Sequence, residues 1–511
     1  MQLQTAAAAP VACTTALLAH PIAKMRKPVQ ATAPKVCHIA ATTEGAKWVF
    51  EQLRDLRDRH GYEVAVILNG LEGELVDRFR AAGITVFASN FDFTSNADLL
   101  SLPRKVVQLV RLLKRERFDV VQTHLFHSMV IGRIAAWFSD VPVRLSMIAG
   151  PFHLEADTPR WIDRYTQWLD TTIIASCEFT RSLYQQMGVP PERLSVIYYG
   201  PDETRFNPDA VSPADLRAEY GWGAETRLIG MIAYFYPELP VNRWIPRQVQ
   251  GRSVKSQEDL VRALPLILER YPQAKVLFVG SGWEQGGREY LEKMQALVLK
   301  LGLDQSVVFA GFRTDISAVL RGLDVAVQCS LSENLGGTIE SLLMACPTVA
   351  TRVGGMVDSV VDGQTGVLVE PANPRSLAEG VMRLLQDPEA ARAIGIAGRQ
   401  RMLAGFTLRH TVERLAELYA SKIAQAPAGY RPLVTVYRLM LGGALCLIIV
   451  LRYCLFDAYL LRKWDLGLRP WQLKAWIQPL RTLLYRVYAF IGRHPTNFGI
   501  RRRLRKWLGR A

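Results

Sequence analysis

The most restrictive feature of the sequence is a stretch with the order strand, glycine pair, helix, strand. A mostly apolar run at residues 325–328 predicts a strand, Gly336 and Gly337 follow a polar loop, residues 338–345 have helical periodicity, and residues 348–350 predict the next strand. In a parallel α/β sheet, ligands bind at the edge where the strands end and the chain continues into helices. Glycine lets a phosphate approach the backbone, and the N–H groups at such a turn can bind it.

A carboxylate follows the glycine pair. Glu340 lies one helical turn further on and can accept hydrogen bonds from ribose hydroxyls, while Thr338 begins the helix and adds its own N–H group to the turn. The alternative is an ordinary turn followed by a surface glutamate, because short glycine motifs alone are weak evidence.

The order of the whole stretch from residue 330 to residue 368 resembles the donor-site signature of the family 4 glycosyltransferases, which are retaining enzymes of the GT-B fold. The matching positions are Glu340, Pro347, Val349, Ala350, Gly354, Gly355, Asp362, Gly363, Thr365 and Gly366. The family separates its two glutamates by seven residues, whereas Glu333 and Glu340 are separated by six, and Ser332 occupies the place of the first. Glu333 remains a donor-binding candidate.

The rest of the chain has the same alternation of element types. Strands are predicted at 36–40, 62–68, 85–88 and 118–123, with helices at 47–59, 75–82 and 106–115 between them. Alternating strands and helices predict a doubly wound parallel sheet. The resemblance continues in pieces from residue 36 to residue 418 and implies an α/β protein of the GT-B class, with two Rossmann-like domains facing across a cleft.

Several candidates follow strands of the first half. Gly45 lies in the loop after the first strand, which the resemblance places near the donor phosphates; an ordinary strand–helix turn is the alternative. His124 ends the strand at 118–123, where an imidazole can exchange hydrogen bonds near a developing charge. The resemblance places His124 beside the transferred sugar, with Gln122 in place of the family's other histidine, and His127 is the alternative.

Two further strand ends carry polar residues. His153 follows a glycine-proline loop and is either a contact to acceptor or donor or an exposed loop residue. Ser176 is predicted to cap the helix that follows it.

Basic residues are the candidates in the second half. In the family an arginine and then a lysine hold the donor diphosphate after the first strand of the second domain. Here an insertion follows that strand, and Lys255 matches the lysine, with Arg252 as the candidate replacement for the arginine and Arg247 behind it. An ammonium neutralises a phosphate as a point charge and a guanidinium can bind it bidentately. A plain surface lysine is the alternative.

Six segments are predicted. They are a disordered leader or mis-called start at 1–34, an acceptor domain at 35–206, a linker at 207–226, a nucleotide-sugar domain at 227–405, a crossing helix at 406–428 and a basic amphipathic and hydrophobic tail at 429–511. The leader lacks the basic start and apolar run of a signal peptide.

The net charge of +15 belongs to the tail. Residues 430–511 hold 16 Lys and Arg against 2 Asp and Glu, which gives +14 and leaves +1 for the rest, so the charge does not indicate nucleic-acid binding. The uncharged run 439–451 is about 20 Å long as a helix, short of the ~30 Å hydrocarbon core. The longer run 433–456 spans only if Arg438 and Arg452 snorkel. Basic residues among Trp and Leu predict contact with an anionic membrane surface, by an in-plane, re-entrant or single-span helix; a helical hairpin packed on the body is the alternative.

Cysteine and acidic patterns give no metal site. The seven cysteines have no metal-ligand spacing and several lie in apolar runs, which predicts buried free thiols in a reducing compartment. No Asp-x-Asp motif follows a suitable strand, so neither a catalytic metal nor another cofactor is expected.

The family resemblance and the basic tail together predict a glycosyltransferase of hexosyltransferase type at the cytoplasmic face of a membrane. It would move a sugar from a nucleotide diphosphate sugar to a lipid-linked or polysaccharide acceptor in envelope or exopolysaccharide synthesis, and the resemblance implies retention of configuration. His124, Lys255 and Glu340 are the expected catalytic residues. Two alternatives stay open: a nucleotide-sugar epimerase of the same fold, and a non-catalytic membrane-bound scaffold.

Overall fold

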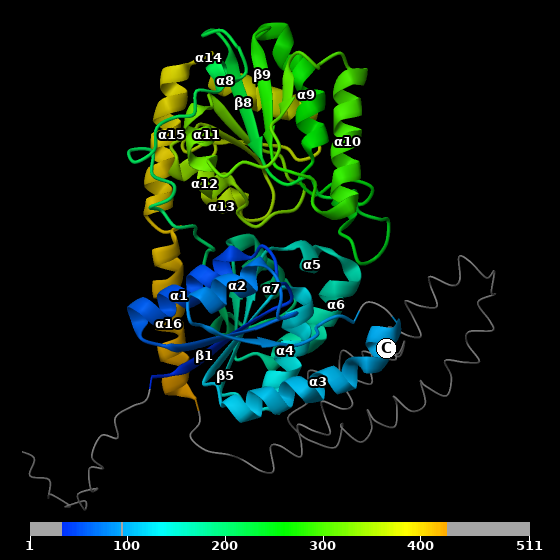
Figure 1. Ribbon diagram of the computed structural model, residues 1–511, viewed down its shortest axis with the longest axis vertical. Helices are drawn as coiled ribbons and strands as arrows, with labels where there is room; N and C mark the ends of the chain where they lie inside the picture. The colour runs from blue at the N-terminus through cyan, green and yellow to red at the C-terminus, as the bar shows by residue number, and fades with distance from the viewer. Residues whose placement is uncertain (1–32, 94–95, 427–511) are drawn as a thin grey trace, which may run out of the picture.

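The computed structural model of the chain describes residues 33–93 and 96–426. The predicted leader lies almost wholly outside this part, and the predicted membrane tail at 429–511 lies entirely outside it. Among the described residues no helix is both long and apolar enough to cross a bilayer. Figure 1 shows the described chain as two α/β halves stacked one above the other.

The first half is built on a seven-stranded parallel sheet of order β3-β2-β1-β4-β5-β6-β7. Its strands are β1 (Lys35–Ala40), β2 (Glu63–Leu68), β3 (Thr85–Ala88), β4 (Val120–His124), β5 (Val143–Ile148), β6 (Thr172–Ala175) and β7 (Leu194–Val196). Its helices are α1 (Lys47–His60), α2 (Glu74–Ala81), α3 (Asn96–Glu116), α4 (Phe126–Phe138), α5 (Phe152–Glu155), α6 (Asp157–Thr166) and α7 (Glu178–Gln186).

The second half is built on a six-stranded parallel sheet of order β10-β9-β8-β11-β12-β13. Its strands are β8 (Arg227–Ile232), β9 (Ala274–Val279), β10 (Val307–Phe309), β11 (Val325–Gln328), β12 (Thr348–Thr351) and β13 (Val367–Val369). Its helices are α8 (Leu216–Glu219), α9 (Gln257–Arg270), α10 (Glu284–Lys300), α11 (Ile316–Gly322), α12 (Thr338–Leu343), α13 (Met356–Ser359), α14 (Pro374–Gln386) and α15 (Pro388–Leu403).

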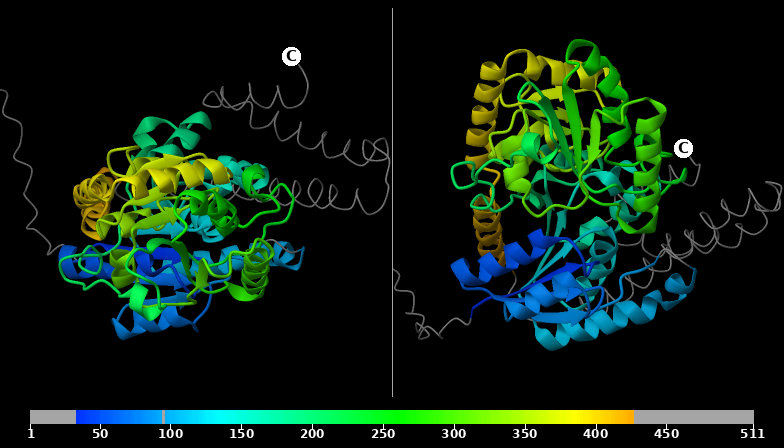
Figure 2. Two further views of the ribbon diagram at one scale, coloured as in Figure 1. Left: turned by 90° about the horizontal axis from the view of Figure 1, so that it is seen from above. Right: turned by 45° about the horizontal axis from the view of Figure 1, so that its top comes forward.

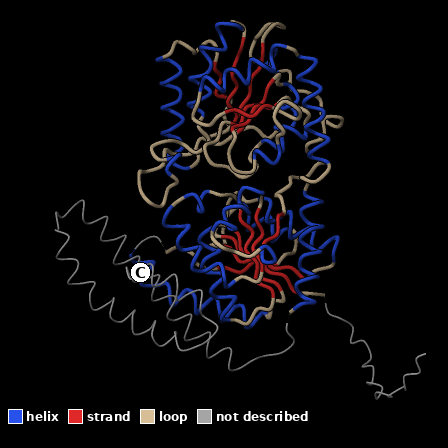
Figure 3. Tube along the Cα trace, turned by 180° about the vertical axis from the view of Figure 1, so that it is seen from behind, coloured by secondary structure: helices blue, strands red, loops and turns tan. Residues whose placement is uncertain are grey.

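Helices cover both faces of each sheet (Figure 3), so the central strands are buried on both sides. In β4 and β11 every residue is buried, although both strands carry polar side chains. This explains why the strands appear in the sequence as short apolar runs without alternation. The four described cysteines, Cys37, Cys177, Cys329 and Cys346, are buried free thiols, as predicted for those positions.

The strand order reverses between β1 and β4 in the first sheet and between β8 and β11 in the second. Ligands of doubly wound sheets bind outside the carboxyl ends of the strands at this reversal. A ligand site is therefore expected at the loops that follow β1, β4, β8 and β11.

A last helix, α16 (Leu408–Gln425), returns from the second half to the first and runs along one side of the molecule (Figures 1 and 2). Leu408, Val412, Leu415 and Tyr419 lie in the hydrophobic core of the first domain. The Tyr419 hydroxyl donates to Gln122 Oε1 at 2.6 Å and lies 3.0 Å from His38 Nε2. The helix is thus fixed to the first domain by both apolar and polar contacts.

The prediction for Ser176 is wrong. The residue that caps α7 is Cys177, whose Sγ accepts from the Thr180 N–H at 3.4 Å. The Ser176 hydroxyl is buried and has no hydrogen-bond partner. The register differs by one residue because α7 begins at Glu178, and only the residue next to the first turn can reach its N–H groups.

Candidate active site

An ion pair marks the carboxyl edge of the second sheet. Lys255 precedes α9, Glu333 follows β11, and the Lys255 ammonium donates to Glu333 Oε2. The two side chains are 18% and 16% exposed, so solvent and ligands can still reach the pair. Burial disfavours the charged ammonium, but the charge of Glu333 leaves the pKa of Lys255 above its ordinary value.

Glu333 is held by its own loop as well as by Lys255. Its Oε2 accepts from Ser330 Oγ at 3.1 Å and its Oε1 accepts from the Asn334 N–H at 3.2 Å. The Leu331 N–H donates to Val254 O at 2.9 Å, which joins the two loops through their backbones. The sequence prediction placed Lys255 and Glu333 in one site, and in the structure they touch.

The glycine turn requires glycine. Gly336 has φ of +54°, and a Cβ there would lie 2.9 Å from Glu333 Cγ; a Cβ on Gly337 would lie 2.5 Å from Gln328 Nε2. Thr338 begins α12 and its hydroxyl is engaged internally, donating to Leu335 O and lying 3.1 Å from Ser359 Oγ. Only backbone groups of this turn are therefore available to a ligand.

Glu340 lies within the electrostatic influence of charged groups of the first domain. Burial raises the pKa of Glu340, the positive charges of Arg205 and Lys255 oppose that effect, and the negative charge of Glu51 adds to it. Arg205 Nη1 lies 3.9 Å from Glu51 Oε1, and Lys47 Nζ lies 3.3 Å from the same oxygen. Glu340 and Lys255 thus share one electrostatic environment with side chains of both domains.

Sequence reasoning missed Arg205, Glu51 and Lys47. The available signal was weak: Lys47 and Glu51 are spaced i, i+4 at the start of α1, next to the loop of Gly45, and Arg205 lies in the segment that ends the first domain. Nothing in the sequence pairs these residues with Glu340.

The two predicted arginines are otherwise engaged. Arg252 Nη2 donates to Asp259 Oδ1 at 2.5 Å and to Ser256 Oγ at 2.9 Å, so its charge is compensated by α9. Arg247 is 88% exposed and lies 3.7 Å from Asp157 Oδ2 of the first domain. Arg252 is close in sequence to Lys255 but has its own carboxylate partner.

His124 is fully buried. Its Nε2 lies 3.2 Å from Gln122 Nε2 and 3.1 Å from His38 Nδ1, and its Nδ1 lies 3.2 Å from the Tyr199 hydroxyl. Burial, with a smaller effect of His38, lowers the pKa of His124 well below its ordinary value, so the ring is neutral. Burial likewise lowers the pKa of the alternative, His127, whose ring centroid lies 4.9 Å from that of Phe93.

Gly45 lies where the two domains approach each other. Gly45 has φ of +61°. A Cβ added to it would lie 3.9 Å from Cη2 of Trp283, which follows β9 in the second domain. Trp283 packs against Tyr234 and Tyr236, with ring centroids 5.2 Å and 5.9 Å away. The loop of Gly45 therefore lies beside an aromatic cluster of the second domain.

His153 belongs to a buried ionic cluster rather than to an exposed loop. Its Nε2 lies 3.6 Å from Asp163 Oδ2, and its side chain is 12% exposed. Arg133, which is fully buried, donates to Asp163 Oδ1 at 2.6 Å and to Asp170 Oδ2 at 2.8 Å. One guanidinium thus serves two buried carboxylates beneath α5.

The domains contact each other through α5, α6 and α7 of the first domain. Ser332 Oγ donates to Glu155 Oε2, the Glu178 N–H donates to Asp358 Oδ2 at 2.6 Å, and the Thr158 N–H donates to Arg243 O at 3.0 Å. The insertion after β8 therefore reaches the first domain.

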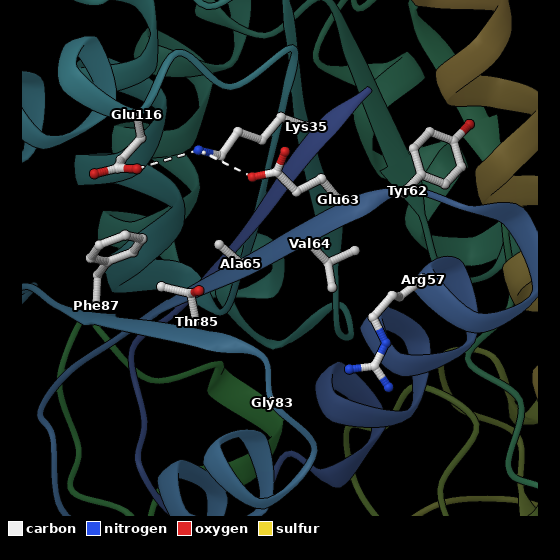
Figure 4. Close-up of a pocket in the computed structure, with 10 residues that line it drawn as sticks. All are labelled: Lys35, Arg57, Tyr62, Glu63, Val64, Ala65, Gly83, Thr85, Phe87 and Glu116. Carbon is white, nitrogen blue, oxygen red and sulfur yellow. Dashed lines mark hydrogen bonds and ion pairs between the residues drawn. The ribbon is translucent and has the colours of Figure 1, made fainter. Parts of the chain in front are cut away.

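A shallow pocket of about 240 Å³ lies elsewhere (Figure 4). It is lined by the amino-terminal ends of β1, β2 and β3, and Lys35 Nζ lies 3.4 Å from Glu63 and 3.3 Å from Glu116 within it. Parallel sheets bind ligands at the opposite edge, so this pocket is not the candidate site. Among residues 33–93 and 96–426, no group of three or more His, Cys, Asp or Glu side chains is arranged to hold a metal ion.

Two family models match the chain. The model for glycosyl transferases group 1 matches residues 250–401, and that for a glycosyl transferase 4-like domain matches residues 44–200. Together they cover more than half of the chain.

Curated relatives share this part of the chain. The chain is 31% identical over 254 residues to a GDP-mannose-dependent alpha-(1-6)-phosphatidylinositol monomannoside mannosyltransferase of Mycolicibacterium smegmatis, covering 48% of this chain and 60% of that one. It is 23% identical over 340 residues to a UDP-Gal:alpha-D-GlcNAc-diphosphoundecaprenol alpha-1,3-galactosyltransferase of Escherichia coli, covering 64% and 82%.

Solved structures have the same architecture. Anabaena Alr3699/HepE in complex with UDP aligns with a TM-score of 0.63 at 22% identity, covering 76% of this chain and 100% of that one. WaaG, a glycosyltransferase involved in lipopolysaccharide biosynthesis, aligns with a TM-score of 0.54 at 15% identity, covering 75% and 99%. The predicted fold of two Rossmann-like domains is confirmed.

Proposed function

The chain belongs to the group 1 glycosyltransferases of the GT-B fold, and we propose that it moves a sugar with retention from a nucleotide diphosphate sugar to the hydroxyl of a lipid-linked or polysaccharide acceptor. The observation that carries the proposal is the Lys255–Glu333 pair beside the Gly336 turn, at the strand-order reversal of the second sheet. Charge and bare backbone N–H groups at that place suit a diphosphate.

Lys255 is the residue proposed to stabilise the leaving nucleoside diphosphate. Its ammonium is held charged by Glu333, and a diphosphate entering the site competes with that carboxylate for the same cation. Positive charge placed where negative charge develops lowers the barrier to bond cleavage. Backbone N–H groups of residues 336–338 add neutral donors to the same phosphates.

Glu340 is proposed to hold the ribose, opposite Arg205 of the first domain. Arg252 and Gly45 stay donor-binding proposals, Arg252 through a change of partner from Asp259. The contact between His124 and the transferred sugar also stays a prediction. Both His124 ring nitrogens already have partners, so the contact requires an exchange of partners or a relay through Tyr199.

The acceptor proposal rests on two supports. The two curated relatives named above carry lipid acceptors in their names, a phosphatidylinositol mannoside and a diphosphoundecaprenol. The basic tail at 430–511, outside the described residues, suits an anionic surface. We accordingly propose action at the cytoplasmic face of a membrane in envelope or exopolysaccharide assembly, without a metal cofactor.

The test is a screen of nucleotide sugars for release of nucleoside diphosphate, with membrane extract as acceptor. We expect one donor to be consumed and its sugar to appear on a lipid or glycan with the anomeric configuration kept. A free nucleotide sugar with altered configuration would instead identify an epimerase, and donor binding without turnover would identify a scaffold.

Lys255→Ala is the matched variant for that screen. Loss of a charge that stabilises the leaving group lowers kcat by roughly 10²- to 10³-fold. Lys293→Ala is the control, because Lys293 forms a comparable ion pair with Glu238 on the outer surface. Unchanged turnover in the Lys255 variant would refute the assignment of that residue.

A further inference from the structure

A carboxylate of the first domain reaches the donor loop of the second. Glu155 ends the short helix α5, and its Oε2 accepts the hydrogen bond from Ser332 Oγ, 177 positions further along the chain. Ser332 stands between the carboxyl end of β11 and the glycine turn, directly before Glu333. Glu155 therefore lies next to the loop that also holds Lys255.

The position of this carboxylate is fixed from both sides. Leu154, its neighbour, is fully buried in a core cluster of the first domain, and Thr158 at the start of α6 donates to Arg243 O of the insertion at 3.0 Å. The Glu155 carboxylate is also within hydrogen-bonding range of Gln248, in the same insertion. A side chain anchored by two domains can act as a geometric reference for a ligand between them.

The surroundings favour recognition of hydroxyls. Glu333 contacts Lys255, and its chain neighbour Ser332 contacts Glu155, so a sugar attached to a diphosphate at Lys255 would come close to the Glu155 carboxylate. Carboxylates form strong, short hydrogen bonds with hydroxyl donors. Burial raises the pKa of Glu155 and the hydrogen bond from Ser332 lowers it.

Glu155 also gives a physical reason for the serine at position 332. A glutamate there would bring a second carboxylate to the oxygen that Ser332 now contacts, and two carboxylates at hydrogen-bond distance repel unless one is protonated. A hydroxyl at that place donates to Glu155 instead of opposing it.

We propose that Glu155 is a specificity-determining residue, which accepts hydrogen bonds from hydroxyls of the transferred sugar. The inference rests on the proposed function, since it presupposes a nucleotide sugar in the site. It assigns part of donor selection to the first domain.

The test compares two ligands on one protein. Binding of the donor found by the screen and of its nucleoside diphosphate alone is measured by calorimetry for the wild type, Glu155→Gln and Glu155→Ala. We expect the nucleotide sugar to bind about 10- to 100-fold more weakly to the alanine variant, with a smaller loss for glutamine, because a charged hydrogen bond to the sugar is lost. Affinity for the nucleoside diphosphate should stay within about twofold, since that ligand has no sugar to contact.

Asp157→Asn is the control, because Asp157 joins the domains through Arg247 without facing the donor loop. Asp157→Asn should leave the ratio of the two affinities unchanged.

A second test moves the carboxylate to the other side of the contact. Ser332→Glu alone should weaken donor binding, and the double variant Glu155→Ser with Ser332→Glu should recover part of the lost affinity.

Equal losses for both ligands would show that Glu155 only joins the domains, and no loss for either would show that it has no role; both outcomes overturn the inference and leave the proposed function intact. A wild-type protein that binds no nucleotide sugar would overturn the proposed function itself.

Discussion

The two domains treat their polar side chains in opposite ways. The first domain holds two buried polar networks, called dry here because their side chains are shielded from solvent. One joins His124 with His38 and Tyr199, and the other joins Arg133 with two aspartates; all are at 0–3% exposure apart from Tyr199, which is half-buried. In the second domain the side chains of Lys255 and Glu333 are 18% and 16% exposed. The first domain is therefore a fixed frame, and the second offers charges that a ligand can recruit.

Removal of the guanidinium at the centre of the first domain should cause the largest loss of stability, and it tests this contrast. Arg133→Met leaves Asp163 and Asp170 buried without their cation, and breaking such a buried pair costs about 3–5 kcal/mol. Thermal unfolding should show a large fall in Tm. Arg111→Met on the exposed face of α3 is the control and should change stability by less than about 0.5 kcal/mol. A stable Arg133 variant would mean that the network is not dry.

A smaller effect comes from the two buried histidines. Burial lowers the pKa of His38 to about 3 and that of His124 well below its ordinary value. Both are neutral when folded and bind a proton when unfolded as pH falls below about 6.5, so the unfolded state gains protons and stability falls toward lower pH.

We expect each histidine to lower the free energy of unfolding by about 1–2 kcal/mol between pH 7 and pH 5. Urea denaturation at the two pH values measures this, and His38→Gln should reduce the difference. A free energy independent of pH would contradict a dry network.

The smallest expected effect comes from the glycine turn of the second domain, which is predicted to position Lys255 through Glu333. Gly336→Ala places a Cβ 2.9 Å from Glu333 Cγ in a left-handed backbone conformation, which costs about 1–2 kcal/mol. Because the strain falls on Glu333, we expect Lys255 to be less well positioned and the donor KM to rise. Gly302→Ala has a similar φ of +67° and open space around it, so it should lose similar stability without changing KM. A similar rise in KM in both variants would mean that the turn has no special link to the donor.

The sequence was sufficient for the local part of this picture. The glycine turn, Lys255 and Glu333 lie in motifs whose residue order fixes the loop, and the alternation of strands and helices predicts both sheets. Glu155, Arg205 and Lys47 were not predictable as neighbours of the donor loop, because only the packing of one domain on the other brings them there. The burial of His124 was missed for a related reason: position at a strand end does not reveal that Trp48, Tyr199 and the polar groups near α16 enclose the ring.

The return of α16 to the first domain has a mechanical consequence. Ile423, near the end of the helix, still packs on the core of that domain, so the chain beyond residue 426 departs from the half that carries Glu155 and not from the half that carries Lys255. An attachment made by that later segment would therefore hold the first domain directly, and the second domain only through the hydrogen bonds and the chain connections that join the two.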